Sequence, residues 1–458
     1  MAVTVYQPTL LYAQGQLTRN ASLAVDGDGR IVAEVPKGAR VEKLENRLLI
    51  PGFVNAHSHA FQRVIRSRTE FIARGHDADD FWSWREAMYL AAHSLSPEEI
   101  YTASLQAFVE MALAGITTVC EFHYLHHQPD GRPYDDAHLL AKQVVRAARD
   151  AGLRILLLRV AYGRAGYQVE ANPRQKRFID SSAHAAMTYT NELVDHYSRD
   201  EYVKVGVAPH SVRAVPGTWL SDFGKQWRNA PLHMHVSEQP AEIRACLAEY
   251  QLRPVELLHE KGLLGPSFTA VHAIHLNERE IDLLGASKSN VCACPSTERN
   301  LGDGIIAADA LRTAGASLCL GSDSQAHVDL LEEMRQLEGH LRLARLKRNV
   351  LDTGDGTANG LGALLLTCAT AGGDRASGLS PRRLAPGDVA DFVTVDLSHP
   401  SLVGCPDAAV LTAVALSASS AAIRDVSVNG TFIVRDGRHA LQQKSAEQFT
   451  ALINKLAS

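Results

Sequence analysis

LLIPGFVNAHSHAFQR, residues Leu48 to Arg63, is the stretch around which the chain is organised. Its apolar run ends in two histidines, His57 and His59, separated by one residue. Side chains of an extended strand alternate between its two faces, so both imidazoles point to the same side. Such a pair can bind one metal ion, but taken alone it more often marks a polar turn after a buried strand. Its meaning therefore depends on partners elsewhere in the chain.

Short apolar runs alternate with helical sequence after Leu48. The helix expected after Ser96 opens with a capping box, Ser96 to Glu99, and stops at Gly115. Seven runs follow the first one: ITTVCEF (116–122), LRILLLRV (153–160), VKVGVAP (203–209), PLHMHVSE (231–238), FTAVHA (268–273), SNVCACP (289–295) and ASLCLGSD (316–323). Eight buried strands separated by helices are typical of a parallel sheet closed into a (β/α)8 TIM barrel, an α/β fold.

Both ends of the chain have the alternating pattern of half-buried strands. The segment ASLAVDGDGRIVAEV has a hairpin turn at Asp26 to Gly29, and ADFVTVDL (390–397) and IRDVSVNGTFIVRDGRH (423–439) are similar near the other end. We therefore expect a small β-sandwich domain made of residues 1–47 and 376–458, the latter with a terminal helix. Residues 48–375 would form the barrel.

The composition excludes several classes of protein. The 458 residues are 46% hydrophobic and 21% charged, with a net charge of −5, which gives no basic surface for nucleic acid. No membrane span and no secretion signal is recognisable, so we expect a cytoplasmic protein. The seven cysteines are scattered, as expected for reduced thiols. Cys292 and Cys294 could be soft metal ligands, but buried strand residues are the better interpretation.

Active residues of such a barrel lie at the carboxyl ends of its strands. Ligand-type side chains gather there on the first, fifth, sixth and eighth strands: His57 and His59; His233, His235 and Glu238; His272; Asp323. Three imidazoles and one carboxylate, or two of each, make a normal zinc shell that leaves room for a water. The sequence thus predicts one metal centre where these strand ends meet.

The segments PGFVNAHSHAFQR, HMHVSEQ, VHA and GSDS resemble those of the amidohydrolase superfamily of metal-dependent barrel hydrolases. This resemblance spans Leu48 to Asp323 and the flanking β domain. It implies His57, His59, His235 and Asp323 as metal ligands, and Glu238, His272 and Asp323 as catalytic groups. Members with two metals carry a lysine at the carboxyl end of strand four. Here Lys204 lies near the start of that strand, so one Zn²⁺ per subunit is expected, with Fe²⁺ as the alternative.

Four further segments, FWSWREAMY, CEFHYLHH, PHSVRAV and CPSTERNLGDG, are similar to the formimidoylglutamate deiminase family within that superfamily. The resemblance implies a substrate pocket lined by Gln62, Arg85, Tyr124, His210 and Arg213. Paired arginines suit a small molecule with two carboxylates, because a guanidinium binds carboxylate in bidentate fashion. The segment after Asp323 departs from the family pattern, with Gln325 where a histidine is expected and His327 two residues later. A homodimer is expected because closed two-fold assemblies are the commonest.

The implied reaction converts N-formimidoyl-L-glutamate to N-formyl-L-glutamate and ammonia in histidine degradation. His272 and Asp323 would orient and deprotonate a metal-activated water, and Glu238 would pass a proton to the imino nitrogen. One alternative is another aminohydrolase of this superfamily, acting on a purine, pterin or triazine ring. A second is a catalytically inactive barrel with a binding role, which would be expected to have lost metal ligands.

Overall fold

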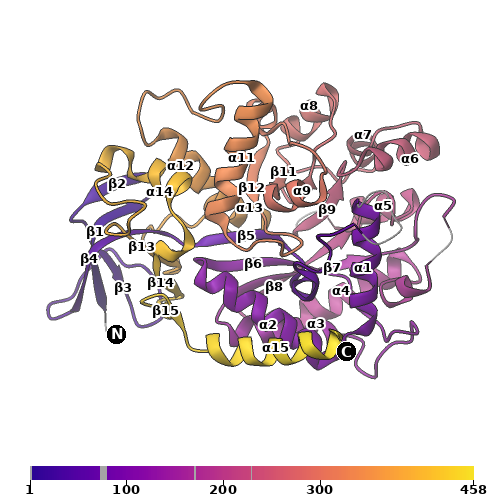
Figure 1. Ribbon diagram of the computed structural model, residues 1–458, viewed down its shortest axis with the longest axis horizontal. Coiled ribbons are helices and arrows are strands. Elements are labelled where there is room, and N and C mark those ends of the chain that lie inside the picture. Colours follow the sequence, from indigo (N-terminus) through magenta and orange to yellow (C-terminus); the bar gives the residue numbers. More distant parts are fainter. Residues whose placement is uncertain (1–2, 73–79, 170–171, 228–229, 458) are drawn as a thin grey trace.

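The computed structural model describes residues 3–72, 80–169, 172–227 and 230–457. It has two parts along its long axis, a barrel and a smaller sheet beside it (Figure 1). The barrel is made of eight parallel strands in chain order: β5 (Phe53–Ser58), β6 (Ile116–His123), β7 (Arg154–Ala161), β8 (Val203–Pro209), β9 (Leu232–Val236), β10 (Phe268–His272), β11 (Asn290–Ala293) and β12 (Ser317–Leu320). The predicted TIM barrel and its eight strands are confirmed.

The barrel closes between its first and last strands. A parallel bridge joins Ser58, at the end of β5, to Asp323, just after β12. Two backbone hydrogen bonds support it: the His59 N–H donates to the Asp323 carbonyl at 3.1 Å, and the Asp323 N–H donates to the His57 carbonyl at 3.0 Å. We call this junction of β5 and β12 the seam.

Helices surround the barrel: α1 (Phe81–Ser94), α2 (Pro97–Leu113), α3 (Leu139–Asp150), α4 (Ala183–His196), α5 (Gly217–Gln226), α6 (Pro240–Tyr250), α7 (Pro254–Glu260), α8 (Glu278–Ala286), α9 (Pro295–Leu301), α10 (Ala308–Ala314) and α11 (Leu330–Arg345). The capping box that opens α2 is present, since Ser96 accepts from the Glu99 N–H and Glu99 accepts from the Ser96 N–H. After α2, Gly115 has a φ of +87°, which glycine adopts without strain and which turns the chain into β6.

The smaller sheet takes strands from both chain ends, as predicted. Its order is β16 (Arg438–His439), β15 (Thr431–Arg435), β14 (Ile423–Val428), β13 (Phe392–Asp396), β4 (Arg40–Pro51), β1 (Thr4–Ala13) and β2 (Gln16–Arg19), with β3 (Leu23–Val25) also paired to β1. All eight strands are hydrogen-bonded into one mixed sheet. The apolar run at Leu48 serves both parts of the molecule, because Leu48 to Pro51 pair with β13 and the barrel strand begins only at Phe53.

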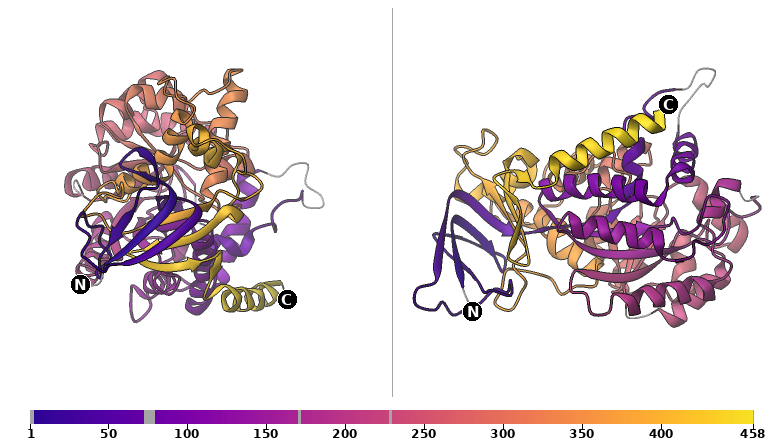
Figure 2. Two further views of the ribbon diagram at one scale, coloured as in Figure 1. Left: turned by 90° about the vertical axis from the view of Figure 1, so that its left-hand side faces the viewer. Right: turned by 90° about the horizontal axis from the view of Figure 1, so that it is seen from below.

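The segment between barrel and C-terminal strands is helical. After α11 come α12 (Gly360–Thr367), the π-helical turn η3 (Cys368–Gly372) and α13 (Gly373–Ala376), followed after β13 by α14 (Val410–Ser417). The terminal helix α15 (Gln442–Ala457) returns to the barrel and packs along α2 (Figure 2). Shorter 3-10 turns complete the described elements: η1 (Ala60–Ile65), η2 (Pro173–Arg177), η4 (Asp407–Ala409) and η5 (Ser420–Ala422). In the described ranges, no helix has the length and apolar character needed to cross a membrane.

Buried ion pairs join the small sheet to the barrel. Asp391, directly before β13, is 1% exposed and accepts from Arg154 Nε at 2.8 Å and from Arg382 Nη1. Its other oxygen accepts from the Asn429 N–H at 2.7 Å. The Asp391 carboxylate therefore compensates two guanidinium groups that water reaches poorly.

We expect Asp391→Ala to destabilise the fold strongly, because removal of one partner leaves buried charges unpaired at a cost of about 3–5 kcal/mol. The measurement is the thermal midpoint followed by circular dichroism. Asp407→Ala, which removes the exposed ion pair to Arg19, is the control and should change the midpoint little. Equal midpoints for the two variants would contradict a structural role for Asp391.

Candidate metal centre and active site

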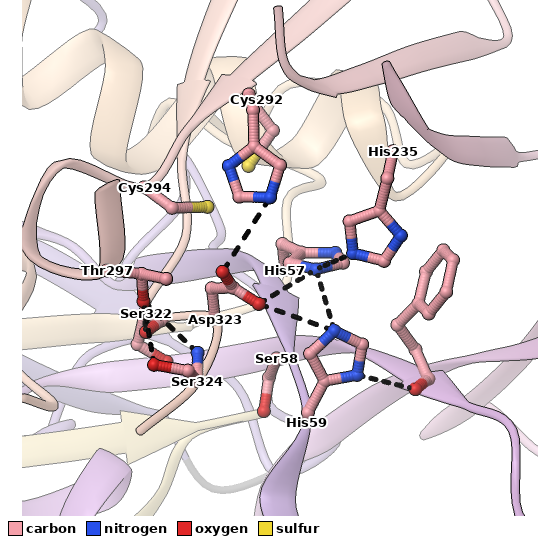
Figure 3. Close-up of polar contacts among 12 residues, drawn as sticks. His57, Ser58, His59, His235, Cys292, Cys294, Thr297, Ser322, Asp323 and Ser324 are labelled. Atoms are coloured by element: carbon pink, nitrogen blue, oxygen red, sulfur yellow. Dashed lines mark hydrogen bonds and ion pairs between the residues drawn. The ribbon is translucent and has the colours of Figure 1, made fainter. Parts of the chain in front are cut away.

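Four predicted ligands meet at the carboxyl end of the barrel (Figure 3). His57 lies in β5, His59 follows it, His235 lies in β9 and Asp323 follows β12. Their ligand atoms all lie within 4.8 Å of one another, and all four residues are buried. Asp323 Oδ1 is 3.2 Å from His57 Nε2 and 3.3 Å from His59 Nε2. The structure thus brings together three segments distant in sequence, and this cluster could hold one metal ion.

The spacing of the imidazole nitrogens fits a tetrahedral metal. His57 Nε2 lies 3.2 Å from His59 Nε2 and 3.2 Å from His235 Nε2. Zinc–nitrogen bonds of about 2.0–2.1 Å place two ligand nitrogens about 3.3 Å apart in a tetrahedral shell. The donor atoms therefore already have the separations that one cation requires.

The outer nitrogens of two of these rings fix their orientation. His59 Nδ1 lies 3.0 Å from the Phe122 carbonyl oxygen, and His235 Nδ1 lies 3.1 Å from the His210 carbonyl oxygen. A carbonyl only accepts, so each Nδ1 carries the proton and each Nε2 keeps its lone pair. Lone pairs that converge without a proton between them repel one another unless a cation lies among them. This is the ligand arrangement of metal-binding histidines.

The expected protonation states also suit a metal. Burial and the neighbouring His57 lower the pKa of His59 to about 3. Burial and the adjacent imidazoles lower the pKa of His235 well below its ordinary value. Burial raises the pKa of Asp323, but the hydrogen bond with His57 and the nearby rings outweigh it, so the net pKa is lowered. Neutral imidazoles and an ionised carboxylate are the forms that bind metal.

Glycine is required at the seam beneath the ligands. A Cβ atom on Gly321 would lie 2.7 Å from His57 Cβ and 2.9 Å from the His57 carbonyl oxygen. The residues around the cluster also have unusual backbone conformations, with φ of +54° at Ser237, +70° at His272 and +50° at Asp323. Strained backbone of this kind collects at functional sites, where surrounding structure holds it in place.

The predicted catalytic groups lie beside the cluster. His272 Nε2 is 3.8 Å from Asp323 Oδ2 and 3.6 Å from Glu238 Oε1, while His272 Nδ1 is 3.4 Å from Glu298 Oε1. Burial lowers the pKa of His272, but Glu238, the hydrogen bond with Glu298 and Asp323 outweigh it and raise the pKa to about 10. His272 therefore faces three carboxylates and can hold a proton between them.

The five predicted substrate residues line one cavity together with His59 and Asp323. These residues are Gln62, Arg85, Tyr124, His210 and Arg213. Gln62 Nε2 donates to the Tyr124 hydroxyl at 2.9 Å. The remaining wall is largely aromatic and includes Phe81, Trp84, Tyr89, Tyr162 and Phe178. The cavity is therefore continuous with the metal cluster and contains both cationic and aromatic groups.

The two arginines differ in their partners. Arg85 forms no ion pair with any described residue and has a buried Nε without a hydrogen-bond partner, while its guanidinium lies 4.4 Å from the Trp82 ring centroid. Arg213 is already engaged: its Nη2 donates to Glu238 Oε2 at 3.1 Å and its Nε to Glu242 Oε2 at 3.0 Å. Arg85 is thus the guanidinium that is free to meet an anion.

His233, His275, Lys204 and Gln325 lie outside the four-ligand cluster. His233 Nε2 bonds the Ala376 carbonyl, and the Lys204 ammonium donates to the Gly378 carbonyl. His275 Nε2 bonds the Asp303 carbonyl. Gln325, the departure from the family pattern, is buried and donates to the Ser58 hydroxyl at 2.8 Å, so it supports the seam and does not line the cavity.

Sequence reasoning missed two buried glutamates. Glu242 is fully buried, pairs with Arg213 and accepts from the Ser237 N–H at 2.7 Å. It lies in the first turn of α6, four residues after Glu238, which directly precedes the N-cap of that helix, and this short spacing was the available signal. Glu298 accepts from the Cys294 N–H at 2.8 Å beside His272. It lies in the quoted segment CPSTERNLGDG, but nothing in its spacing distinguishes it from a surface residue.

Comparison with known proteins agrees with this geometry. The model of the amidohydrolase family matches residues 48–433. Formimidoylglutamate deiminase from Pseudomonas aeruginosa is 36% identical over 442 residues, covering 96% of each chain. An 8-oxoguanine deaminase from the same species is 28% identical and covers 94% of each chain.

Solved structures show the same architecture. A structure described as an amidohydrolase from Brucella melitensis has a TM-score of 0.91 and 33% identity, covering 99% of this chain and 100% of its own. An atrazine chlorohydrolase from Arthrobacter aurescens, in complex with zinc, has a TM-score of 0.83 at 20% identity, covers 98% of this chain and 100% of its own, and supports the fold alone. The chain belongs to the amidohydrolase family and is a hydrolase that acts on carbon–nitrogen bonds.

Proposed function

We propose that this enzyme is a metal-dependent deiminase that hydrolyses N-formimidoyl-L-glutamate to N-formyl-L-glutamate and ammonia, a step of histidine degradation. The observation that carries the proposal is the Arg85 guanidinium, free of carboxylate partners among the described residues and facing the same cavity as His59 and Asp323. A substrate with two carboxylates suits such a group. The 36% identity with a formimidoylglutamate deiminase supports the same choice.

The chemistry requires water to add to a poorly electrophilic carbon and ammonia to leave. His57, His59, His235 and Asp323 would hold one divalent cation, Zn²⁺ or Fe²⁺, which when bound supplies Lewis-acid activation of water at neutral pH. Asp323 takes up the proton that the water loses through its Oδ2, and the His272 imidazolium, whose Nε2 lies 3.8 Å away, orients the water. Glu238 gives a proton to the imino nitrogen of the substrate, so that ammonia is expelled and the amide nitrogen stays.

Arg213 has a second role beside the expected contact with substrate. Because it holds Glu238 Oε2 with Nη2 and Glu242 with Nε, it fixes the catalytic carboxylate. Its Nη1 forms no hydrogen bond or ion pair with any residue that the structure describes, and remains for the substrate. Arg213 is therefore both a positioning residue for Glu238 and a second contact for a carboxylate, next to Arg85.

An aminohydrolase acting on a purine ring is the second candidate. The aromatic wall of Phe81, Trp84, Tyr89, Tyr124, Tyr162 and Phe178 favours it, because such side chains can stack on a planar ring. The test is to incubate the zinc-loaded protein separately with N-formimidoyl-L-glutamate, adenosine and guanine, and to measure ammonia. Release from the first alone supports the proposal, and release from a purine alone overturns it.

We expect Arg85→Met to lower kcat/KM for N-formimidoyl-L-glutamate about 10- to 150-fold, the equivalent of losing one charge-assisted hydrogen bond of about 1.5–3 kcal/mol. Methionine keeps the length of the side chain but cannot bind a carboxylate. Steady-state kinetics provide the measurement, and Arg279→Met, at an exposed arginine on α8, is the control. Unchanged kcat/KM would contradict the role of Arg85 in recognition.

The structure and the related proteins leave the homodimer and the cytoplasmic location untested. They stay predictions. Light scattering of the purified protein would test the first of them.

A further inference from the structure

A second group of metal-type donors lies next to the four-ligand cluster. His272, Cys294 and Asp323 each offer one ligand atom, these atoms lie within 4.8 Å of one another, and all three residues are buried. Asp323 belongs to both groups. Its Oδ1 faces His57 and His59, whereas its Oδ2 is the oxygen near His272 Nε2, at 3.8 Å. The two oxygens of one carboxylate thus serve two neighbouring sets of donors, as in a bridging carboxylate.

His272 is oriented in the same way as the ligand histidines. Its Nδ1 lies 3.4 Å from Glu298 Oε1, so that nitrogen carries the proton and donates to the carboxylate. Its Nε2 is fully buried and has no hydrogen-bond partner in the described part of the chain. A carboxylate on the outer nitrogen is the usual partner of a metal-binding histidine, and a cation at Nε2 takes the place of the proton that this nitrogen carries at neutral pH.

Glu298 also holds the cysteine in place. The oxygen that accepts from His272 accepts from the Cys294 N–H at 2.8 Å. One buried carboxylate therefore fixes both the imidazole and the backbone of the thiol residue. Figure 3 shows Cys294 beside the Asp323 carboxylate, and of the two cysteines on this segment only Cys294 has its sulfur within 4.8 Å of the His272 and Asp323 ligand atoms.

Charge favours a cation at this position. Glu238, Glu298 and Asp323 approach His272 to 3.6, 3.4 and 3.8 Å in a buried environment. Without a metal, the His272 imidazolium and the Arg213 guanidinium on Glu238 compensate this buried negative charge, and a cation that displaces the His272 proton takes over that compensation. A thiol, an imidazole and a carboxylate together match the ligand preferences of Zn²⁺ and are unsuited to Mg²⁺ or Ca²⁺, which prefer oxygen.

We propose that His272, Cys294 and Asp323 form a second site for a soft divalent cation such as Zn²⁺, and that its occupancy inhibits the enzyme. Binding converts the Cys294 thiol to a thiolate and the His272 imidazolium to a neutral imidazole, and releases both protons to solvent. Inhibition follows because the cation occupies His272 Nε2 and Asp323 Oδ2, the atoms that orient the water and accept its proton. This inhibitory consequence rests on the proposed function, whereas the binding site does not.

The competing structural interpretation is that Cys294 is simply a core residue. It belongs to a small buried cluster with Ala56, Val271, Cys292, Cys319 and Ala376. A core thiol would tolerate serine at some cost in stability but would contribute nothing to metal content. The two interpretations therefore differ in a quantity that can be measured directly.

The experiment loads metal-stripped protein with Co²⁺ and follows equilibrium dialysis together with near-ultraviolet absorption, where thiolate-to-cobalt charge transfer appears. We expect two equivalents per chain, one of them accompanied by the thiolate band, because the first site contains no sulfur ligand. Cys294→Ser should keep one equivalent, lose the band and retain its fold by circular dichroism. Cys405→Ser, at a partly exposed cysteine far along the chain, is the control and should keep both.

The outcomes are decisive for binding. A wild-type protein that stops at one equivalent, a second equivalent without a thiolate band, or a Cys294→Ser variant that keeps two would each overturn the site. If Cys294→Ser binds less than one equivalent of Co²⁺, Cys294→Ala is measured in its place and judged by the same criteria.

Activity tests the inhibitory consequence separately. Excess Zn²⁺ should inhibit ammonia release by the wild type. For each protein, the measured quantity is the Zn²⁺ concentration that halves its own uninhibited rate. This concentration should be at least about tenfold higher for Cys294→Ser than for the wild type. If no substrate is turned over, the proposed function fails while the dialysis result stands. If turnover is normal and Cys294→Ser is inhibited as readily as wild type, the inhibitory role is wrong.

Discussion

Replacing Glu238 by glutamine should leave the metal content unchanged and lower kcat by about a hundred- to ten-thousand-fold, the usual contribution of a general acid–base group. Glutamine keeps the size of the side chain but cannot give up a proton to the imino nitrogen. The four predicted ligands are untouched, because Glu238 lies beside His272 and Arg213 and outside the four-ligand cluster.

The measurement pairs metal analysis with steady-state ammonia release. Glu249→Gln is a matched control in α6, the helix that follows Glu238, since Glu249 pairs with Arg164 away from the cavity, and it should keep nearly full activity. A Glu238→Gln protein with normal kcat would exclude the proton-transfer role. Loss of metal from this variant would instead place Glu238 among the ligands.

His235→Ala should abolish both metal binding and activity. The substitution removes one of three imidazoles whose lone pairs converge, and leaves a site with two nitrogens and one carboxylate. We expect at least about a tenfold lower metal content after dialysis, by analogy with the effect of losing even an outer-sphere partner. Added zinc should also no longer raise the thermal midpoint, because a ligand stabilises only the state that binds it.

The strand offers its own control two residues earlier. His233 is equally buried but bonds the Ala376 carbonyl, so His233→Ala should lose stability while keeping metal and turnover. If the two variants behave alike, the assignment of His235 as a ligand is wrong. If His235→Ala keeps its metal and its rate, the four-ligand centre is wrong.

Most of the barrel could be predicted because its strands are short, apolar and separated by well-marked helices. The capping box at Ser96 and the positive-φ glycine at Gly115 are local signals that do not depend on the rest of the fold. The division of the first apolar run was not predictable. Leu48 to Pro51 and Phe53 onward look alike in sequence, and only the pairing with β13 separates them.

Part of the site could likewise be predicted from the sequence, and part could not. The spacing of His57 and His59 on one strand indicates a ligand pair, but their distances to His235 and Asp323 depend on barrel closure. Arg213 illustrates the limit most clearly. Its residue type suggested a contact with substrate, whereas its hydrogen bonds to Glu238 and Glu242 depend on which side chains the fold happens to place within reach.

The seam has a consequence for how the enzyme is made. Two ligands come from the first barrel strand, but Asp323 comes 264 residues after His59, at the close of the last. During synthesis, His57, His59 and His235 leave the ribosome before Asp323 does. Asp323 can reach His57 and His59 only when the last barrel strand pairs with the first. All four donors therefore come together late in biosynthesis. A metal ion bound to them links β5, the first barrel strand, to the segment after β12, the last one.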